Sequence, residues 1–182
     1  MRRKSTKEYL AESFRELAET NPIDKITVQD IVKNCEYSTA TFYRHFKDKY
    51  DLIAWSQTRS VAAIMDGIGK DGYTWEQALL AGAQLYDTDR EYYTNLFLHT
   101  GGQDSFIQYM TEINFEAIKK QCLRLSGETE LDEKTQMYIR IYSLGASHLT
   151  CEWILGKYKI SAEEFAQIYI NAVPAPLRKY FH

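Results

Sequence analysis

Apolar residues recur at intervals of three and four along almost the whole chain, and this spacing is typical of helices that bury one face. No long run alternates apolar and polar residues as a strand would, and only three prolines and nine glycines interrupt the pattern. The sequence therefore predicts an all-α fold of about nine helices. They are expected over 6–19, after Thr27, after Ser38, from 47 or 48 to a break at 67–72, from Thr74 to about 87, over 90–99 with a break at 101–102, over 104–125, over 132–155, and from Ser161 to before Pro174.

Capping residues support several of these helix starts. A hydroxyl just before a helix accepts a hydrogen bond from a free N–H group of the first turn. Thr27 precedes the second helix, and Asp30 can return a bond to it as in a capping box. Ser38 precedes the third helix. The same pattern occurs in "TWEQ" at Thr74 and in "SAEE" at Ser161.

The second and third helices are short and lie close together in sequence, which predicts a helix-turn-helix. In that motif the first helix braces the second, whose outer face enters the DNA major groove. At 100° per residue, Phe42 and Phe46 fall on one side of the third helix, the natural core side. The outward and flanking positions are then held by Ala40, Thr41, Tyr43, Arg44 and His45. These side chains could hydrogen-bond to base edges and phosphates.

The distribution of charge also favours binding of a polyanion at the N-terminal end of the chain. Residues 1–60 hold 11 Lys+Arg and 9 Asp+Glu, a balance of +2, whereas residues 61–182 hold 11 and 16, a balance of −5. Only the N-terminal third could attract a polyanion, although a count does not show how charge is distributed over faces.

The stretch "ITVQDIVKNCEYSTATFYRHFKDKYDL" (26–52) resembles the N-terminal DNA-binding domain of the TetR family of bacterial transcriptional regulators. The resemblance covers about residues 6–53 and centres on "TFYRHFKDKYDL". It implies double-stranded DNA as a partner, with base-reading or groove-lining roles for Thr39, Ala40, Thr41, Tyr43 and Arg44. It implies phosphate contacts for Thr27, Ser38, His45 and Lys49. Thr27 and Ser38 could also be caps and nothing more.

The turn departs from the family pattern at one position. Where the family usually has glycine, this chain has Glu36, so a side chain stands where a left-handed backbone is expected. The expected cost is about 1 kcal/mol, enough to alter the turn but not to abolish the fold. Glu36 also places a negative charge near the DNA.

The C-terminal pieces "DREYYTNLF", "GGQDSFIQYM" and "CEWILGKYKISAEEFA" resemble, less specifically, the DhaS subgroup of this family, some of whose members work with a protein coactivator. We expect residues 1–48 to form the DNA-binding domain and residues 49–182 an effector-binding and dimerisation domain. Aromatic density in the second region predicts a site for a small apolar or aromatic effector. The expected lining is Tyr86, Tyr93, Phe97, Phe106, Tyr109 and Met110. A packed core is the alternative for the same residues.

The predicted helix over 132–155 carries two apolar stripes and therefore needs two partners. The first stripe, which includes Met137, Ile141 and Leu144, is expected to face its own domain. The second is expected to face a two-fold partner, and a homodimer predicts a pseudo-palindromic operator. The expected interface comprises Tyr138, Tyr142, Gly145, Leu149 and Trp153, with Phe165, Ile168 and Tyr169 from the last helix. A monomer with one fully buried helix is the alternative.

Common catalytic signatures are missing, including the P-loop, GxGxxG, HExxH and GxSxG. Three widely spaced cysteines offer neither a disulfide framework nor a CxxC metal site. We therefore expect no enzyme activity, cofactor, metal or membrane partner, and a cytoplasmic location, since the N-terminal stretch lacks an apolar signal region. The leading hypothesis is a homodimeric repressor that responds to an effector. A co-regulator controlled by a protein partner and an all-α small-molecule binder or enzyme remain alternatives.

Overall fold

Helices account for all the regular secondary structure that the computed structural model describes, which covers residues 4–101 and 105–181. The all-α prediction is confirmed. The α-helices are α1 (Thr6–Ala18), α2 (Val28–Asn34), α3 (Thr39–Tyr43), α4 (Lys49–Met65), α5 (Trp75–Thr88), α6 (Arg90–His99), α7 (Phe106–Ser126), α8 (Glu133–Ile154) and α9 (Ala162–Asn171). Two 3₁₀ helices, η1 (Ile23–Lys25) and η3 (Ala175–Tyr180), were not predicted.

The predicted caps are present. Thr27, Ser38, Thr74 and Ser161 each accept a hydrogen bond from a backbone N–H three residues later, and all but Ser38 belong to a complete capping box. Asp48 caps α4. The predicted break at 101–102 and the predicted start at 104 fall partly on residues 102–104, outside the described residues.

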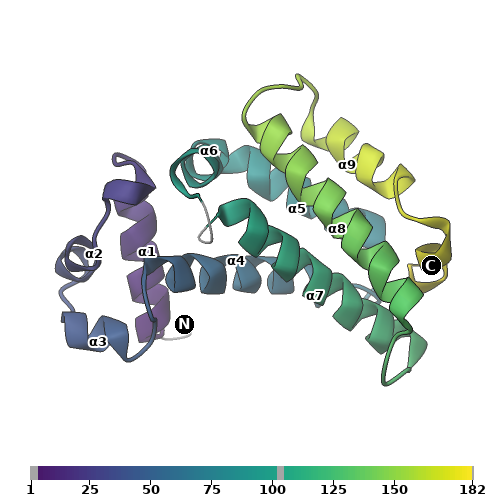
Figure 1. The fold of residues 1–182 in the computed structure, drawn as a ribbon, viewed down its shortest axis with the longest axis horizontal. Helices are drawn as coiled ribbons and strands as arrows, with labels where there is room; N and C mark the ends of the chain where they lie inside the picture. The colour runs from purple at the N-terminus through teal and green to yellow at the C-terminus, as the bar shows by residue number, and fades with distance from the viewer. Residues whose placement is uncertain (1–3, 102–104, 182) are drawn as a thin grey trace.

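The first three helices form a separate unit at one end of the molecule, and α4 leads from it into the remaining helices (Figure 1). Leu10 and Phe14 of α1, Ile31 of α2, Phe42 of α3 and Leu52 of α4 are fully buried together. Their burial supplies the main driving force for this unit, at about 1.5–3 kcal/mol for each large apolar side chain. The buried cluster continues through α6 to α9, so α1–α3 are packed onto the larger unit.

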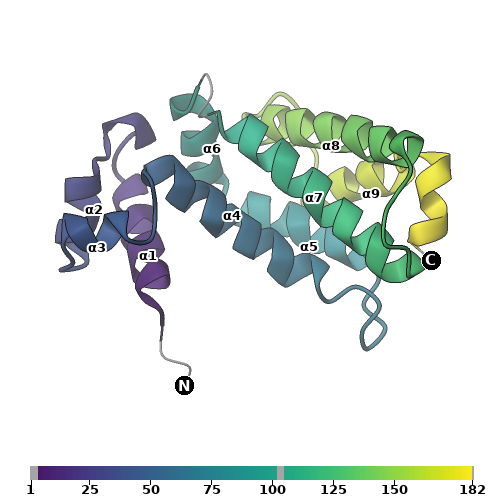
Figure 2. The ribbon, with the colours of Figure 1, turned by 60° about the horizontal axis from the view of Figure 1, so that its bottom comes forward.

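The larger unit, from α4 to the C-terminal end, contains two stacked aromatic pairs. Trp153 of α8 stacks on Phe165 of α9 with ring centroids 4.1 Å apart, and Trp75 of α5 stacks on Phe181 at 4.0 Å. Helix α7 packs against α8 and α4, and α5 packs against α9 and α4 (Figure 2). None of the described helices is long and apolar enough to cross a membrane.

Candidate nucleic-acid interface and effector pocket

The outer face of α3 is arranged as the helical wheel predicts. Phe42 and Phe46 are buried, with ring centroids 5.7 Å apart, and they fix the inner side of the motif. Tyr43 is 60% exposed. The exposed residues of this surface are Ser38, Thr39, Ala40, Tyr43, Arg44 and His45, with Thr41 half-buried. The sequence pattern therefore located the exposed residues of this surface correctly, except that Thr41, which was expected to face outward, is half-buried.

Hydrogen bonds along α3 hold its polar side chains in place. Ser38 Oγ accepts from the Thr41 N–H at 3.1 Å, which caps the helix. Arg44 Nη2 donates to Thr41 Oγ1 at 3.0 Å, so the guanidinium lies along the outer face of α3. Exposed bonds of this kind contribute little to stability and can be exchanged for bonds to another partner.

The turn between α2 and α3 has the backbone that the sequence predicts. Glu36 has φ of 58°, in the left-handed region, and the following Tyr37 N–H donates to Val32 O at 2.9 Å. The turn therefore closes despite the glutamate, at the expected cost of about 1 kcal/mol. The Glu36 side chain is exposed, and it carries its negative charge beside the candidate DNA surface.

A shallow hollow beside α3 contains residues that sequence reasoning did not single out. Lys4, Ser5, Lys7, Tyr9 and Tyr37 line it together with Thr6 and the predicted His45. Lys7 Nζ lies 5.1 Å from the centroid of the Phe46 ring, so α1 presents its cation directly next to the helix-turn-helix. The basic run at the start of the chain was the signal that could have identified this extension.

The structure differs from the prediction at Lys49. Its ammonium was expected to be exposed and to contact phosphate, but the side chain is half-buried. Lys49 Nζ donates to the carbonyls of Ile23, Asp24 and Ile26 at 2.8, 3.1 and 2.8 Å. Burial lowers the pKa of this ammonium. Since a lysine has three N–H donors, all of them are used within the chain.

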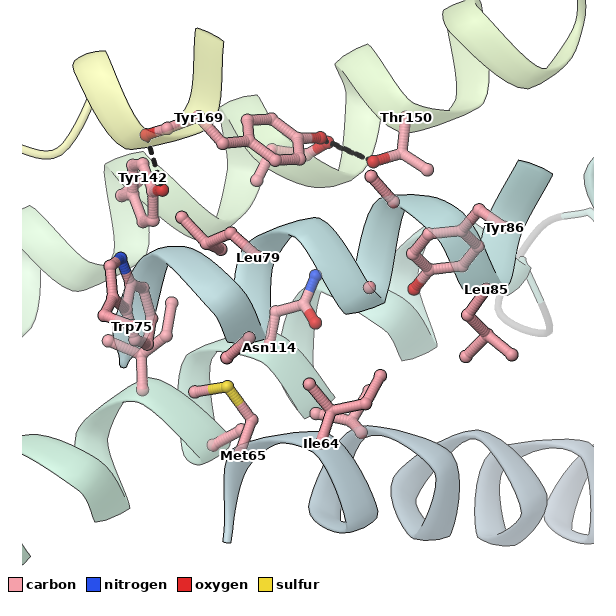
Figure 3. A pocket seen from close by; sticks show the side chains of 17 residues that line it. Ile64, Met65, Trp75, Leu79, Leu85, Tyr86, Asn114, Tyr142, Thr150 and Tyr169 are labelled. Carbon is pink, nitrogen blue, oxygen red and sulfur yellow. Dashed lines mark hydrogen bonds between the residues drawn. The ribbon is translucent and has the colours of Figure 1, made fainter. Parts of the chain in front are cut away.

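A cavity of about 100 Å³ lies among α4, α5, α7, α8 and α9 (Figure 3). Only Tyr86 of the six predicted effector contacts lines it. Its other lining residues are Val61, Ile64, Met65, Trp75, Ala78, Leu79, Gly82, Ala83, Leu85, Asn114, Ala117, Ile118, Tyr142, Ala146, Thr150 and Tyr169.

The remaining five predicted contacts do not line this cavity. Tyr93, Phe97, Phe106 and Met110 are buried in the core that joins α6 and α7, and Tyr109 also lies outside the lining. Their rings fill the space that a ligand would need: the Phe97 and Phe106 centroids are 5.2 Å apart. Aromatic density indicated a core here, and the cavity lies further along the bundle.

Buried polar contacts connect the cavity wall to neighbouring helices. Gln57 of α4 donates to the Tyr86 hydroxyl at 2.8 Å and accepts from the Tyr93 hydroxyl at 3.3 Å. On the opposite wall, the Tyr142 hydroxyl donates to Tyr169 O at 2.9 Å, and the Tyr169 hydroxyl contacts Thr150. Burial raises the pKa of Tyr86, Tyr142 and Tyr169, so these phenols are neutral at physiological pH.

The two apolar stripes of α8 are not buried in the way that was predicted. Trp153 and Phe165 are buried inside their own chain, and Tyr142 is held against α9 by its hydrogen bond. These three residues therefore cannot form the main contact with a second copy. Of the predicted interface, Tyr138, Gly145 and Ile168 are exposed, while Leu149 and Tyr169 are half-buried.

The stripe that was expected to face inward is the exposed one. Met137 and Ile141 are 64% and 62% exposed, and Leu144 and Leu155 are also exposed. Periodicity reveals two apolar stripes but not which of them the rest of the chain covers. The larger aromatic surface of the stripe that contains Trp153 gains more from burial.

Among the described residues, no group of three or more His, Cys, Asp or Glu side chains is placed to hold a metal ion.

Two family descriptions match the chain. "Bacterial regulatory proteins, tetR family" matches residues 12–54, and "Transcriptional regulator C-terminal region", a TetR C-terminal family, matches residues 73–174. The second match alone covers more than half of the chain. The chain belongs to the TetR family of transcriptional regulators.

One curated TetR-family relative is the HTH-type dhaKLM operon transcriptional activator DhaS of Lactococcus lactis subsp. lactis (strain IL1403). It is 26% identical over 93 residues, which are 51% of this chain and 49% of the relative. The chain thus spans about half the length of the curated relative that it matches.

Solved TetR structures share the fold. "Dihydroxyacetone kinase operon activator DhaS" has a TM-score of 0.66 and 19% identity, covering 97% of this chain and 98% of that one. FadR of Thermus thermophilus, a TetR-family repressor in complex with lauroyl-CoA, has a TM-score of 0.64 and 13% identity over 92% of each chain. A TetR regulator from Streptococcus agalactiae 2603V has a TM-score of 0.63 and 20% identity, covering 92% and 93%. At these identities the likeness concerns the fold alone, whereas the family matches make the chain a DNA-binding transcriptional regulator.

Proposed function

We propose that this TetR-family regulator is a homodimeric repressor that reads a pseudo-palindromic operator with α3 and responds to a small effector in the cavity. The exposed face of α3 carries the DNA part of the proposal, because its donors stand on a short helix braced by buried Phe42 and Phe46. In this proposal residues 1–48 form the DNA-binding domain, and residues 49–182 bind the effector and dimerise.

The individual roles follow from exposure and chemistry. Arg44 and Thr41 read base edges, since an arginine fork pairs well with guanine. Thr39 and Ala40 line the groove, and Tyr43 contacts its rim. Phosphate contacts are assigned to Ser38, Thr27, His45 and Lys47, with Lys7 added from α1. Lys47 is exposed, and in this proposal it makes the phosphate contact that the resemblance implies for Lys49.

A binding experiment separates these roles. After selection of the operator from random DNA, fluorescence anisotropy should show that Arg44→Ala relaxes base preference, with each bidentate contact worth about 1–3 kcal/mol. Tyr43→Ala should weaken binding to all sequences alike. Lys47→Ala should reduce the slope of log affinity against log salt by about one unit.

The matched control is Lys70→Ala, an exposed lysine in the loop between α4 and α5 at the far end of α4. Its salt slope should equal that of the wild type. If Arg44→Ala and Tyr43→Ala both bind as the wild type does, α3 is not the reading helix.

The resemblance to DhaS, which is named as an operon activator, favours a second candidate function. In this alternative the chain is a TetR-like co-regulator controlled by a protein partner. An operator-release assay on folded wild-type protein separates the two. Release of DNA by the part of a cell extract that passes a small-pore membrane supports the small effector. Release only by the retained protein fraction, with capture of the partner by pull-down, supports the protein partner.

A further inference from the structure

Thr41 lies deeper than the residues beside it on the surface that α3 offers to DNA. Ser38 and Arg44 are exposed, whereas Thr41 is half-buried. A short hydroxyl side chain can read a base edge only from the outermost part of a helix, because the edge lies at the floor of the major groove. The depth of Thr41 therefore favours a contact within the protein over a base contact of its own.

The Thr41 hydroxyl joins two neighbours on α3. Arg44 Nη2 donates to Thr41 Oγ1 at 3.0 Å, and Ser38 Oγ lies 3.0 Å from the same oxygen. Ser38 is itself fixed, because its Oγ caps α3 by accepting from the Thr41 N–H at 3.1 Å. The guanidinium is thus connected through Thr41 to the cap at the start of the helix.

The direction of these bonds follows from the donors that each side chain has. Arginine can only donate, so Thr41 Oγ1 is the acceptor of the Arg44 bond and its own proton stays available for Ser38 Oγ. A hydroxyl that accepts from a charged donor is polarised and becomes a better donor itself. The favoured chain of hydrogen bonds therefore runs from Arg44 to Thr41 to Ser38.

These contacts leave the DNA-facing part of Arg44 free. Arginine carries five N–H donors. Two of them are used within the helix, since Nε donates to Ala40 O at 3.4 Å and Nη2 donates to Thr41. Both donors of Nη1 and the second donor of Nη2 remain, and a fork of this kind fits O6 and N7 of guanine. A guanidinium that is oriented before binding also loses less rotamer freedom on binding.

We propose that Thr41 is a positioning residue for Arg44, whose guanidinium it orients toward one base pair of each half-site. Thr41 and Arg44 then act on the same base pair, Arg44 by direct contact and Thr41 through Arg44. This inference rests on the proposed function for α3 as the reading helix, but the bond between Thr41 and Arg44 does not require DNA.

Thr41→Val tests the hydroxyl alone. Valine keeps the branching at Cβ and the backbone N–H that Ser38 caps, so α3 should stay folded. Fluorescence anisotropy measures binding to the operator selected from random DNA and to its variants at each base pair. Thr41→Val should lower discrimination about two- to tenfold at the base pair where Arg44→Ala lowers it, and at no other. Thr41→Ser, which retains a hydroxyl, should restore the wild-type preference.

A double variant distinguishes positioning from direct reading. If Thr41 acts through Arg44, Thr41→Val combined with Arg44→Ala should discriminate no worse at that base pair than Arg44→Ala alone. A further loss in the double variant, or relaxed preference at a different base pair in Thr41→Val, would mean that Thr41 reads a base itself and would overturn the proposal. Unchanged preference in Thr41→Val would overturn it as well. Thr58→Val, at an exposed threonine of α4 whose hydroxyl donates to Ala54 O, is the matched control and should bind as the wild type does.

The protein without DNA separates this inference from the proposed function. ¹⁵N relaxation of the Arg44 Nε–H group, assigned with Arg44→Lys, should show a restricted side chain in the wild type and in Thr41→Ser and a mobile one in Thr41→Val. Equal mobility in the wild type and Thr41→Val would overturn the positioning contact. A side chain restricted by Thr41, together with an Arg44→Ala variant that keeps every base preference, would overturn the base reading in the proposed function and leave the contact valid.

Discussion

Lys49 joins α4 to the connection between α1 and α2. Its ammonium meets three carbonyls in and just after η1, at the point where the backbone turns back toward α2. Those carbonyls are not all satisfied by regular helix bonds, and a charged donor satisfies them more strongly than a neutral one. A basic side chain in a DNA-binding motif can thus stabilise the fold, while a neighbouring residue is left to contact phosphate.

We predict that Lys49→Met destabilises the protein by about 1.5–3 kcal/mol, the usual contribution of a hydrogen bond to a charged group. Methionine keeps the apolar stem, so the loss comes from the ammonium. Lys47→Met, an exposed neighbour, should change stability by less than about 0.5 kcal/mol. Urea unfolding followed by circular dichroism measures both. If Lys49→Met is as stable as Lys47→Met, the three short contacts do not hold η1.

Helix α6 holds the DNA-binding unit from the other side. The Asn95 side chain accepts from the Ile23 N–H at 3.1 Å and donates to the carbonyls of Ala18 and Asn21 at 2.8 Å each. Arg15 of α1 pairs with Asp89 at the start of α6. Through Tyr93 and Gln57, the same helix reaches the cavity wall at Tyr86. Helices α4 and α6 are therefore both placed to transmit a change in the cavity to α1–α3.

We predict that Asn95→Ala loosens this contact and lowers stability by about 1–3 kcal/mol, since two carbonyls and one N–H lose a partner in a half-buried position. The effect that identifies the loss of this contact is faster hydrogen exchange of the Ile23 amide, because Asn95 Oδ1 is its acceptor. Mass-spectrometric or NMR exchange measures it directly.

Asn34→Ala is the matched control. Its amide donates to Ser13 and Glu16, so it joins α2 to α1 inside the DNA-binding unit and makes no hydrogen bond to the described residues of α6. It should leave exchange at Ile23 unchanged. Wild-type protection of Ile23 in Asn95→Ala would mean that α6 does not hold the connection between α1 and α2.

Local signals predicted the elements well because their causes are local. The Thr27 and Ser38 caps, the buried pair Phe42 and Phe46 and the left-handed backbone at Glu36 each depend on a few neighbouring residues. The exposure predicted for the Lys49 side chain was wrong because its hydrogen-bond partners lie 23 to 26 residues earlier in the chain, at a turn that the sequence pattern did not reveal.

Long-range packing decided the rest of the candidate site. Tyr93 and Phe97 carry the composition of a binding pocket and pack as core, while the cavity forms where small residues such as Gly82, Ala83 and Ala146 leave space between helices. Composition cannot distinguish these outcomes, because both use the same apolar side chains.

Helix α8 presents an apolar stripe that the described part of the chain leaves exposed. It runs from Met137 to Leu155, roughly 27 Å along the helix at 1.5 Å per residue. Tyr138, Ile141 and Leu144 lie within it, and Gly145 has open space where a Cβ would be. Exposed apolar surface of this extent marks an interaction site. Helices α8 and α9 lie far from α1–α3 in both views, so pairing through this face leaves two DNA-binding units free (Figures 1 and 2).

We predict that the wild type has a mass of twice 21.3 kDa by light scattering at micromolar concentration and that Ile141→Glu reduces it to 21.3 kDa. Ile141 is 62% exposed in the single chain, so glutamate there is harmless to the monomer, but two-fold pairing would bury it without a counter-charge. Leu98→Glu is the matched control, at 60% exposure on α6, and should remain dimeric. Ile141→Glu should also lose about 100-fold in operator affinity, because a monomer engages one half-site where the dimer engages two. A wild type of single-chain mass, or a dimer that tolerates Ile141→Glu, would exclude this stripe as the contact between copies.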